Sequence, residues 1–351
     1  MNSKEKNNPL VSVNMVVYNG EKYISEAIKS ILNQTYKNFE FIIVNDGSAD
    51  LTEQIIKSFS DKRIKYYEHD KNYGEPFARN TAIKKSNGKY IAILDADDIS
   101  FPTRFKEQVD FLEKNNEYGL IGGIAEIINE KGKSQEYSQS RSYPPEDTKV
   151  LLLFRNCFTP SSFMCRTEEL KKIGFNNNRF IACDYEMAVK FSRISKIYNL
   201  DKILIQYRKH SESILATNRD KQIFHEKEII MFQLSELGIS PTKHELFIHQ
   251  NIRKKNYHKI DSNYYDSLDW LDKLYNSNEN RAIFTNPEFY NRISGYWFNL
   301  INNPIQYNIK LLKPYYSSPI LRASNRSFMD HLFFTVKCIF ITKNKNDNDF
   351  L

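Results

Sequence analysis

The sequence predicts an α/β protein whose N-terminal half forms a mostly parallel sheet between layers of helices, followed by a mainly helical C-terminal region. Two patterns in the first half favour this class: short β-branched runs, and stripes of apolar residues three and four positions apart between them. The runs are apolar nearly throughout, as is typical of strands covered on both faces. Nine of the eleven glycines lie before residue 175, so tight turns are concentrated there too.

We expect strands in five places, each a short apolar run: 10–17, 39–44, 64–67, 90–94 and 197–205. The first helix between them carries one apolar stripe, formed by Ile24, Ala27, Ile28, Ile31 and Leu32. Asp50 is expected to cap the next helix. A later helix opens near Pro76 and closes at Gly88, the usual placement of these residue types. Pro102 starts a further helix that ends near Asn116.

The composition of the 351 residues indicates an ordinary globular chain of about two domains. Hydrophobic residues make up 40% and charged residues 26%, which excludes disordered and collagen-like classes. The four cysteines show neither a CxxC pair nor metal-ligand spacing. No signal-peptide pattern and no run of about 18 apolar residues is found, so we expect a cytoplasmic protein. The net charge of +7 is dispersed, which does not favour a nucleic-acid partner.

We expect a catalytic domain in residues 1–215 and a helical region in 216–351, with helices near 220–237, 243–257 and 264–276. The segment 327–342 is apolar but interrupted by Asp330, His331 and Lys337, and residues 301–351 hold seven Lys or Arg against three Asp. It either docks on an anionic membrane face or packs as a helix on the catalytic domain. His244 and His249, five residues apart, share no helical face and predict no metal site.

Polar residues follow the predicted strands, where ligands of open parallel sheets bind. Tyr18 follows the first strand, Asp46 the second, and the run Asp95, Asp97 and Asp98 the fourth. Clustered carboxylates repel one another unless a cation lies among them, and oxygen ligands suit Mg²⁺ or Mn²⁺. No GxGxxG follows the first strand and no P-loop motif occurs, which argues against a dinucleotide site and a P-loop site. A nucleotide diphosphate bridged by a divalent metal fits this pattern.

The sequence resembles glycosyltransferase family 2, inverting enzymes with the nucleotide-sugar-binding GT-A fold. The resemblance covers roughly residues 9–213 and rests on four ordered blocks: VSVNMVVYNGEKYISEAIKSILNQTYKNFEFIIVNDGSAD, NYGEPFARNTAIKKSNGKYIAILDADD, CDYEMAVKFS and YRKHSESI. It implies a nucleotide-binding part at about 9–116 and an acceptor part at about 117–215. The segment 156–164 resembles the wall on the acceptor side.

The resemblance implies roles for three residues near the nucleotide. Tyr18 would stack on uracil, and Asp46 would accept the uracil N3–H, which cytosine lacks. Arg79 would lie near the phosphates, where a guanidinium fork suits the oxygens. For each residue a purely structural role is the alternative. Tyr18 would cover the end of the sheet, Asp46 would form an Asx-turn, and Arg79 would form a surface ion pair.

The resemblance also implies the metal and phosphate ligands. Asp97 would bind the metal directly, and Asp95 would contact the ribose or sugar beside it. Arg208 would offset the charge of the departing diphosphate, and His210 would contact phosphate or metal. Asp98 is expected to support these residues or to start a helix.

Asp184 is the candidate catalytic base, which takes the proton from an acceptor hydroxyl as that hydroxyl attacks the anomeric carbon. Met187, Ala188 and Phe191 follow at helical spacing, so Asp184 should begin a helix, and a simple N-cap is the alternative. Cys183 stands where the family carries an acid, which removes one carboxylate.

The function implied is metal-dependent, inverting transfer of a sugar from a UDP-sugar to a glycan or lipid-linked hydroxyl, with Mn²⁺ or Mg²⁺ as cofactor. The alternative is a catalytically decayed, nucleotide- or glycan-binding subunit of a glycan assembly complex, suggested by Cys183. A nucleic-acid binder is a weaker third reading.

Overall fold

The structure is a computed structural model that describes residues 8–138, 142–178, 181–211, 213, 217–253, 264–301, 309–322 and 327–348. The chain forms two compact units. The N-terminal unit comprises residues 1–152 and 156–229, and the C-terminal unit comprises 153–155 and 230–351. The assignment of catalysis to residues 1–215 stays a prediction, because packing of the chain does not show which part reacts.

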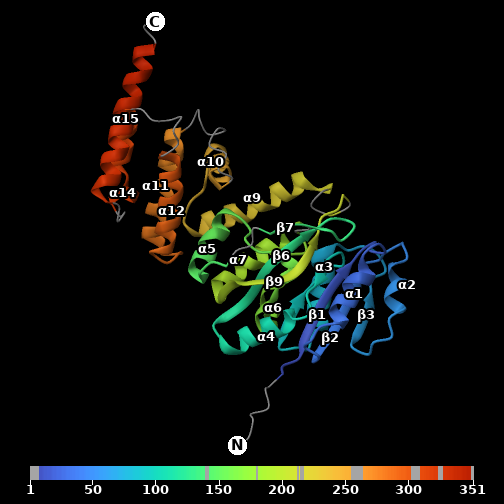
Figure 1. Cartoon of the computed structure of the whole chain (residues 1–351). Helices are drawn as coiled ribbons and strands as arrows, with labels where there is room; N and C mark the ends of the chain where they lie inside the picture. Colours follow the sequence, from blue (N-terminus) through green and yellow to red (C-terminus); the bar gives the residue numbers. More distant parts are fainter. Residues whose placement is uncertain are drawn as a thin grey trace, which may run out of the picture. The chain divides into compact units, whose positions relative to one another are not determined.

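A mixed nine-stranded sheet runs through the N-terminal unit in the order β3-β2-β1-β4-β8-β6-β9-β5, and β7 pairs with β6 (Figure 1). The bounds are β1 (Val11–Val17), β2 (Phe39–Asn45), β3 (Ile64–Glu68), β4 (Tyr90–Ile93), β5 (Ile99–Ser100), β6 (Tyr118–Ile128), β7 (Ser134–Tyr137), β8 (Met164–Arg166) and β9 (Lys196–Arg208). The pairs among β1 to β4 are parallel, whereas β8 is antiparallel to both its neighbours. The predicted α/β class is confirmed.

Alternate residues of β1 face opposite sides of the sheet, as the two-residue period of a strand requires. Val13 and Met15 pack with one helical layer, which consists of α1 (Ile24–Leu32), α2 (Thr52–Lys57) and α4 (Arg104–Lys114). On the other face, α3 (Glu75–Lys85) packs on β2, where Ala78 contacts the cluster of Ile42 and Val44. The sheet is therefore buried on both faces, which explains its continuous apolar strands.

Several helix ends differ from expectation. The helix predicted to close at Gly88 ends at Lys85, because the chain at Gly88 already lies against β1: a Cβ there would come 2.5 Å from the backbone nitrogen of Ser12. Asp50 is not the cap of α2, because Leu51 occupies that position. Asp50 instead accepts a hydrogen bond from the N–H of Thr52 (3.0 Å).

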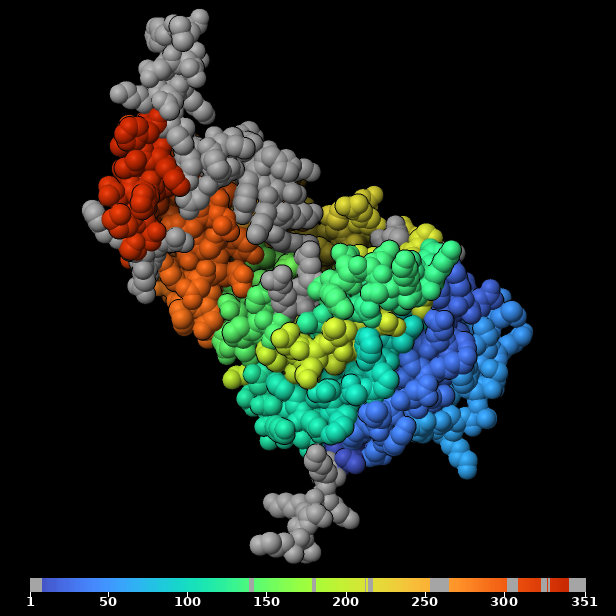
Figure 2. Space-filling view, in the orientation of Figure 1, coloured from blue at the N-terminus to red at the C-terminus, as the bar shows by residue number. Residues whose placement is uncertain are grey.

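The predicted acceptor part, at about 117–215, contains elements that the sequence did not predict. They are the strands β6, β7 and β8, α5 (Pro145–Phe154), the 3₁₀ turn η1 (Pro160–Ser162) and α6 (Thr167–Ile173). They precede α7 (Cys183–Ile194), whose apolar face packs with α5 and α6. In the space-filling view, residues up to about 70 and residues beyond about 100 form neighbouring regions of the surface of the N-terminal unit (Figure 2).

The C-terminal unit is helical, as predicted. Its helices, together with α9, which begins in the N-terminal unit, are α9 (Arg219–Glu236), α10 (Lys243–Arg253), α11 (Tyr264–Arg281), α12 (Glu288–Ile301), η5 (Ile309–Leu311), α13 (Leu312–Ser317), α14 (Pro319–Arg322) and α15 (Phe328–Asn348). Trp270, Trp297 and Tyr315 are fully buried in it. In the part of the chain that the structure describes, no helix has the length and apolarity needed to cross a membrane.

Candidate active site

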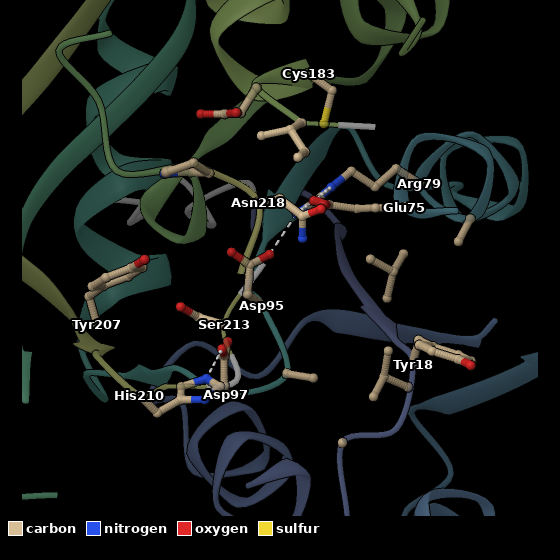
Figure 3. A pocket seen from close by; sticks show the side chains of 18 of the residues that line it. Tyr18, Glu75, Arg79, Asp95, Asp97, Cys183, Tyr207, His210, Ser213 and Asn218 are labelled. Atoms are coloured by element: carbon tan, nitrogen blue, oxygen red, sulfur yellow. Dashed lines mark hydrogen bonds and ion pairs between the residues drawn. The ribbon is translucent and has the colours of Figure 1, made fainter. Parts of the chain in front are cut away.

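A wide cavity of about 1930 Å³ opens at the carboxyl ends of β1, β2 and β4 in the N-terminal unit. Side chains from the strand ends, α3, α7 and the segment after β9 point into it (Figure 3). Pockets for small ligands usually measure about 300 to 1,000 Å³. This cavity is larger than that range.

The loop after β1 presents Tyr18 to the cavity with half of its surface exposed. The next residue, Asn19, has φ of +52°, which turns the chain sharply at the strand end. Its side-chain oxygen accepts a hydrogen bond from the N–H of Ala49 (2.9 Å), and its own N–H donates to Ser48 Oγ (2.9 Å). The two loops after β1 and β2 are thus tied together beneath an exposed aromatic ring.

Asp46, at the end of β2, is buried and held by three donors. The N–H groups of Tyr73 and Gly74 donate to its two oxygens (3.1 and 2.8 Å), and His69 Nδ1 lies 2.6 Å from Oδ1. The neighbouring Asn45, not Asp46, bonds to the turn that we considered for Asp46: its side-chain oxygen accepts the N–H of Ser48 (3.0 Å). His69 was missed, because a single histidine after a strand carries no sequence signal.

Arg79 lies between two carboxylates rather than on the surface. Its guanidinium is 2.6 Å from Asp95 Oδ1 and 2.7 Å from Glu75 Oε1, and only 6% of the residue is exposed. Although burial alone would lower it, these two carboxylates raise the pKa of Arg79. Glu75 was not singled out from the sequence. The three side chains form a charge cluster along one wall of the cavity (Figure 3).

Asp97 and His210 meet at one edge of the cavity, with Nε2 2.9 Å from Oδ2 (Figure 3). The other ring nitrogen of His210 is buried and has no hydrogen-bond partner within the described ranges. No cluster of three or more His, Cys, Asp or Glu side chains that could hold a metal occurs among the described residues. The protein therefore offers two candidate metal ligands here, Asp97 and His210. Asp95 is turned away from them, because it contacts Arg79.

Arg208 does not face the cavity as expected. It is almost fully buried, and its guanidinium contacts Glu26 Oε2 (2.6 Å) and donates to the backbone oxygens of Asp97 (3.0 Å) and Glu130 (3.2 Å). These contacts hold the guanidinium in the protein interior, and Arg208 is not among the residues that line the cavity. Lys209 and His210, its neighbours, line the cavity instead.

Asp98 lies behind the metal-site candidates. It is buried and accepts the backbone N–H of Arg208 (2.8 Å). Burial, together with the charges of Asp97 and Asp95, raises the pKa of Asp98. Asp98 therefore supports the loop, which was one of the two roles that we expected for it.

Asp184 lies in the first turn of α7, but Ala182 is the N-cap, so the simple capping alternative is wrong. Ala182 has φ of +62°, which turns the chain so that α7 starts at the cavity. Burial, reinforced by the negative charge of Glu75, raises the pKa of Asp184 to about 6. Asn156 Nδ2 donates to Asp184 Oδ2 (2.7 Å). A carboxylate with this pKa is ionised at neutral pH yet basic enough to accept a proton.

The far wall of the cavity comes from parts of the chain for which no function was predicted. Glu136 and Tyr137 of β7 and the following Ser138 line it, as do side chains from the first two turns of α9: Lys221, Gln222, His225 and Glu226. The predicted acceptor segment 156–164 contributes Asn156, Phe158, Thr159 and Pro160. No motif marked α9, because its cavity-lining residues are of ordinary helical composition.

Comparisons with known proteins agree with this site. Residues 12–174 match the model of the family described as "Glycosyl transferase family 2". An uncharacterised glycosyltransferase of Haemophilus influenzae is 34% identical over 249 residues, which cover 67% of this chain and 77% of that protein. An uncharacterised glycosyltransferase of Methanocaldococcus jannaschii is 35% identical over 58% of this chain and 72% of that protein.

Two solved structures have a similar fold. S. aureus TarS 1-349 in complex with UDP-GlcNAc matches with a TM-score of 0.53 and 20% identity, covering 82% of this chain and 83% of that one. The mannosyltransferase PcManGT from Pyrobaculum calidifontis, in complex with GDP-Man and Mn²⁺, matches with a TM-score of 0.52 and 16% identity over 95% and 87%. At these identities the likeness shows the fold.

The family match, the glycosyltransferase relatives and the shared fold agree with the strand-end acids and the cavity. The chain belongs to glycosyltransferase family 2 and is a nucleotide-sugar-dependent glycosyltransferase with the GT-A fold.

Proposed function

We propose that the enzyme transfers a sugar, with inversion, from a UDP-sugar to a hydroxyl of a glycan or lipid-linked acceptor, assisted by a divalent metal. The observation that carries the proposal is that Tyr18, Arg79, Asp97, His210 and Asp184 all line one cavity. Its volume of about 1930 Å³ is larger than the usual range for a pocket that holds one small ligand.

Uridine is the base that we assign to the donor. Tyr18 is exposed beside Asp46, whose Oδ2 accepts one backbone N–H and keeps a lone pair for another donor. Uracil presents such a donor at N3. The structurally similar proteins bind UDP-GlcNAc in one case and GDP-Man in the other, so the choice rests on the residues of this chain.

Asp97 and His210 are the residues that would hold the metal. A carboxylate oxygen and an imidazole nitrogen 2.9 Å apart form a mixed donor pair, which suits Mn²⁺ better than Mg²⁺. Two protein ligands suffice where diphosphate oxygens and water complete the shell. When bound, the metal would neutralise charge on the diphosphate.

Of the remaining groups, Asp184 and Arg79 act on the substrates and Cys183 does not. Asp184 takes the proton of the acceptor hydroxyl as its oxygen attacks the anomeric carbon from the side opposite the diphosphate. That attack inverts the configuration. Arg79 fixes Asp95 and supplies positive charge beside the phosphates. Cys183 replaces an acid at the cavity wall, and its thiol takes no part in the proton transfer, because burial raises its pKa.

The test is to screen UDP-sugars for transfer or donor hydrolysis and then to compare the wild type with Asp184→Asn. The variant should bind UDP as tightly as the wild type and lose transfer. Full activity in Asp184→Asn would contradict the assigned base. If the wild type binds UDP but turns over none of the UDP-sugars, the result would support the decayed-subunit alternative instead.

We also propose that α15 docks on an anionic membrane face. Apolar side chains are exposed along the helix at Met329, Leu332, Phe333, Val336 and Phe340, at helical spacing. The opposite side of the helix packs within the C-terminal unit, where Phe334 stacks on Tyr315 with ring centroids 4.1 Å apart. The excess of Lys and Arg in residues 301–351 complements an anionic surface.

Vesicle sedimentation tests this docking. Binding to vesicles containing phosphatidylserine should fall in Phe333→Ser/Phe340→Ser and should fall with added salt. A protein that sediments equally with neutral vesicles, or whose binding is unchanged in the double variant, would contradict the proposal.

A further inference from the structure

A short stretch of chain, residues 152–158, connects the C-terminal end of α5 to the wall of the cavity, and we call it the base-support segment. Its first residue and its last three belong to the N-terminal unit, while residues 153–155 belong to the C-terminal unit. The segment is one continuous run of seven residues.

At the cavity end, Asn156 is held in one orientation. Its Oδ1 accepts the backbone N–H of Phe158 (3.1 Å), so the amide nitrogen must face the other way. That nitrogen donates to Asp184 Oδ2 (2.7 Å). This bond holds one oxygen of a carboxylate that lines the cavity, and so restricts the orientation of the base.

Two more bonds from the N-terminal unit hold the segment. The hydroxyl of Tyr185, the residue after the base, donates to the carbonyl oxygen of Leu152. Asn199 Nδ2 donates to the carbonyl oxygen of Cys157 (2.8 Å). Tyr185 and Asn199 are each only 1% exposed. Water therefore does not compete for these bonds.

In the C-terminal unit, His249 anchors the middle of the segment. Trp270 Nε1 donates to His249 Nδ1 (3.2 Å), so that nitrogen carries no proton and the imidazole is neutral. The proton is on Nε2, which donates to the carbonyl oxygen of Leu153 (3.0 Å). The ring also stacks on Phe154, with centroids 4.7 Å apart and planes 9° from parallel. His249 and Phe154 are fully buried.

We propose that the base-support segment positions the catalytic base: Asn156 orients Asp184, and His249 holds Leu153 and Phe154 in the chain that leads to Asn156. The inference rests on the proposed function, in which Asp184 is that base. Asn156 and His249 act as positioning residues. Only Phe154 and Arg155 separate Leu153 from Asn156, so a displacement at Leu153 has a short stretch of chain to travel.

The first test replaces His249 by Phe in the full chain, which keeps the ring stack and removes both hydrogen bonds. We expect kcat for a UDP-sugar that the wild type uses to fall about tenfold to a hundredfold, because misplacement of about 1 Å costs that much, with KM for the donor unchanged. Hydrogen exchange of the amides of residues 156–158 should rise. His249→Gln, which retains a donor, should recover part of both.

Asn278→Ala is the matched control. Asn278 is also buried in the C-terminal unit and bonds to the backbone N–H and carbonyl of Phe284 (2.9 and 3.0 Å), away from the segment. It should lower the stability of that unit and leave kcat and exchange at 156–158 unchanged. If His249→Phe behaves like Asn278→Ala, the positioning role of His249 is wrong.

Asn156→Asp gives a second, independent readout. It is isosteric but puts a second carboxylate against Asp184, which favours protonation of the base and should move the acidic limb of the kcat against pH profile upward. An unchanged limb would contradict the role of Asn156. If Asp184→Asn loses transfer but His249→Phe and Asn156→Asp both behave like the wild type, this inference alone is refuted. If Asp184→Asn retains full transfer, the proposed base is refuted.

Discussion

Asp97 and His210 are 113 positions apart in the sequence, yet their side chains meet with Nε2 2.9 Å from Oδ2. The contact joins the loop after β4 to the segment after β9. Both segments follow strands of the same sheet, so the fold brings a carboxylate and an imidazole to one edge of the cavity. Arg208 strengthens this junction, because its guanidinium donates to the backbone oxygen of Asp97 (3.0 Å).

The rate of transfer should depend on the ionisation of Asp184. Burial raises the pKa of this group to about 6, and only the ionised form accepts a proton. Activity is therefore present above pH 6 and lost as the pH falls through that value. A profile of kcat between pH 4.5 and 8 checks this. An acidic limb near the ordinary carboxyl pKa of about 4 would show that Asp184 is not the titrating base.

Tyr18 should contribute to nucleotide binding through its ring. Stacking on a base is worth about 1 to 3 kcal/mol, so Tyr18→Ala should raise the Kd for UDP about 5-fold to 150-fold. Tyr18→Phe retains the ring and serves as the control, with a Kd close to that of the wild type. Calorimetry measures both. Equal affinities of the Ala and Phe variants would contradict the stacking role.

Gly47→Ala should distort the loop that holds Asp46. Gly47 has φ of +73°, and a Cβ would lie 2.5 Å from the backbone carbon of Lys71. We expect a loss of about 1 to 3 kcal/mol in the free energy of unfolding and weaker UDP binding. Gly295→Ala in α12 is the control, because a Cβ there meets nothing within 4 Å and should stabilise the helix by about 0.5 to 1 kcal/mol. Similar losses in both variants would contradict the account.

Arg79→Met should destabilise the protein, because it leaves two carboxylates facing each other. Breaking a buried ion pair costs about 3 to 5 kcal/mol, and partial exposure of Glu75 and Asp95 reduces this to about 2 to 3 kcal/mol. Urea denaturation measures the loss. Lys57→Met removes an exposed ion pair with Glu53 and should have a much smaller effect on the free energy of unfolding. A loss no larger than in this control would refute the cluster.

The parallel part of the fold could be predicted from the sequence because its strands are buried on both faces and read as continuous apolar runs. Phe39 and Ile64 begin β2 and β3 at the expected residues. The antiparallel strand β8, only three residues long, gave no usable pattern. Its place between β4 and β6 depends on long-range pairing, which local periodicity does not encode.

The candidate site was predictable only in part, for a similar reason. Tyr18, Asp97, His210 and Asp184, which the motifs singled out, line one cavity, because the strand ends of a sheet converge. Arg208 was misplaced, since the sequence does not show which way a side chain at the end of β9 points. Glu75 and His69 were missed, and Asn156 was predicted only as part of the acceptor-side wall, because its bond to Asp184 joins residues that are distant in sequence.

The central claim is that Asp97 and His210 hold a divalent metal that binds the diphosphate of a uridine nucleotide. Calorimetric titration of UDP into the full chain, with and without Mn²⁺, tests it most directly. We predict binding that requires Mn²⁺ in the wild type, is lost in Asp97→Asn and is retained in Asp110→Asn, a surface carboxylate paired with Lys106. Equal UDP affinity with and without Mn²⁺, or unchanged binding in Asp97→Asn, would contradict the account.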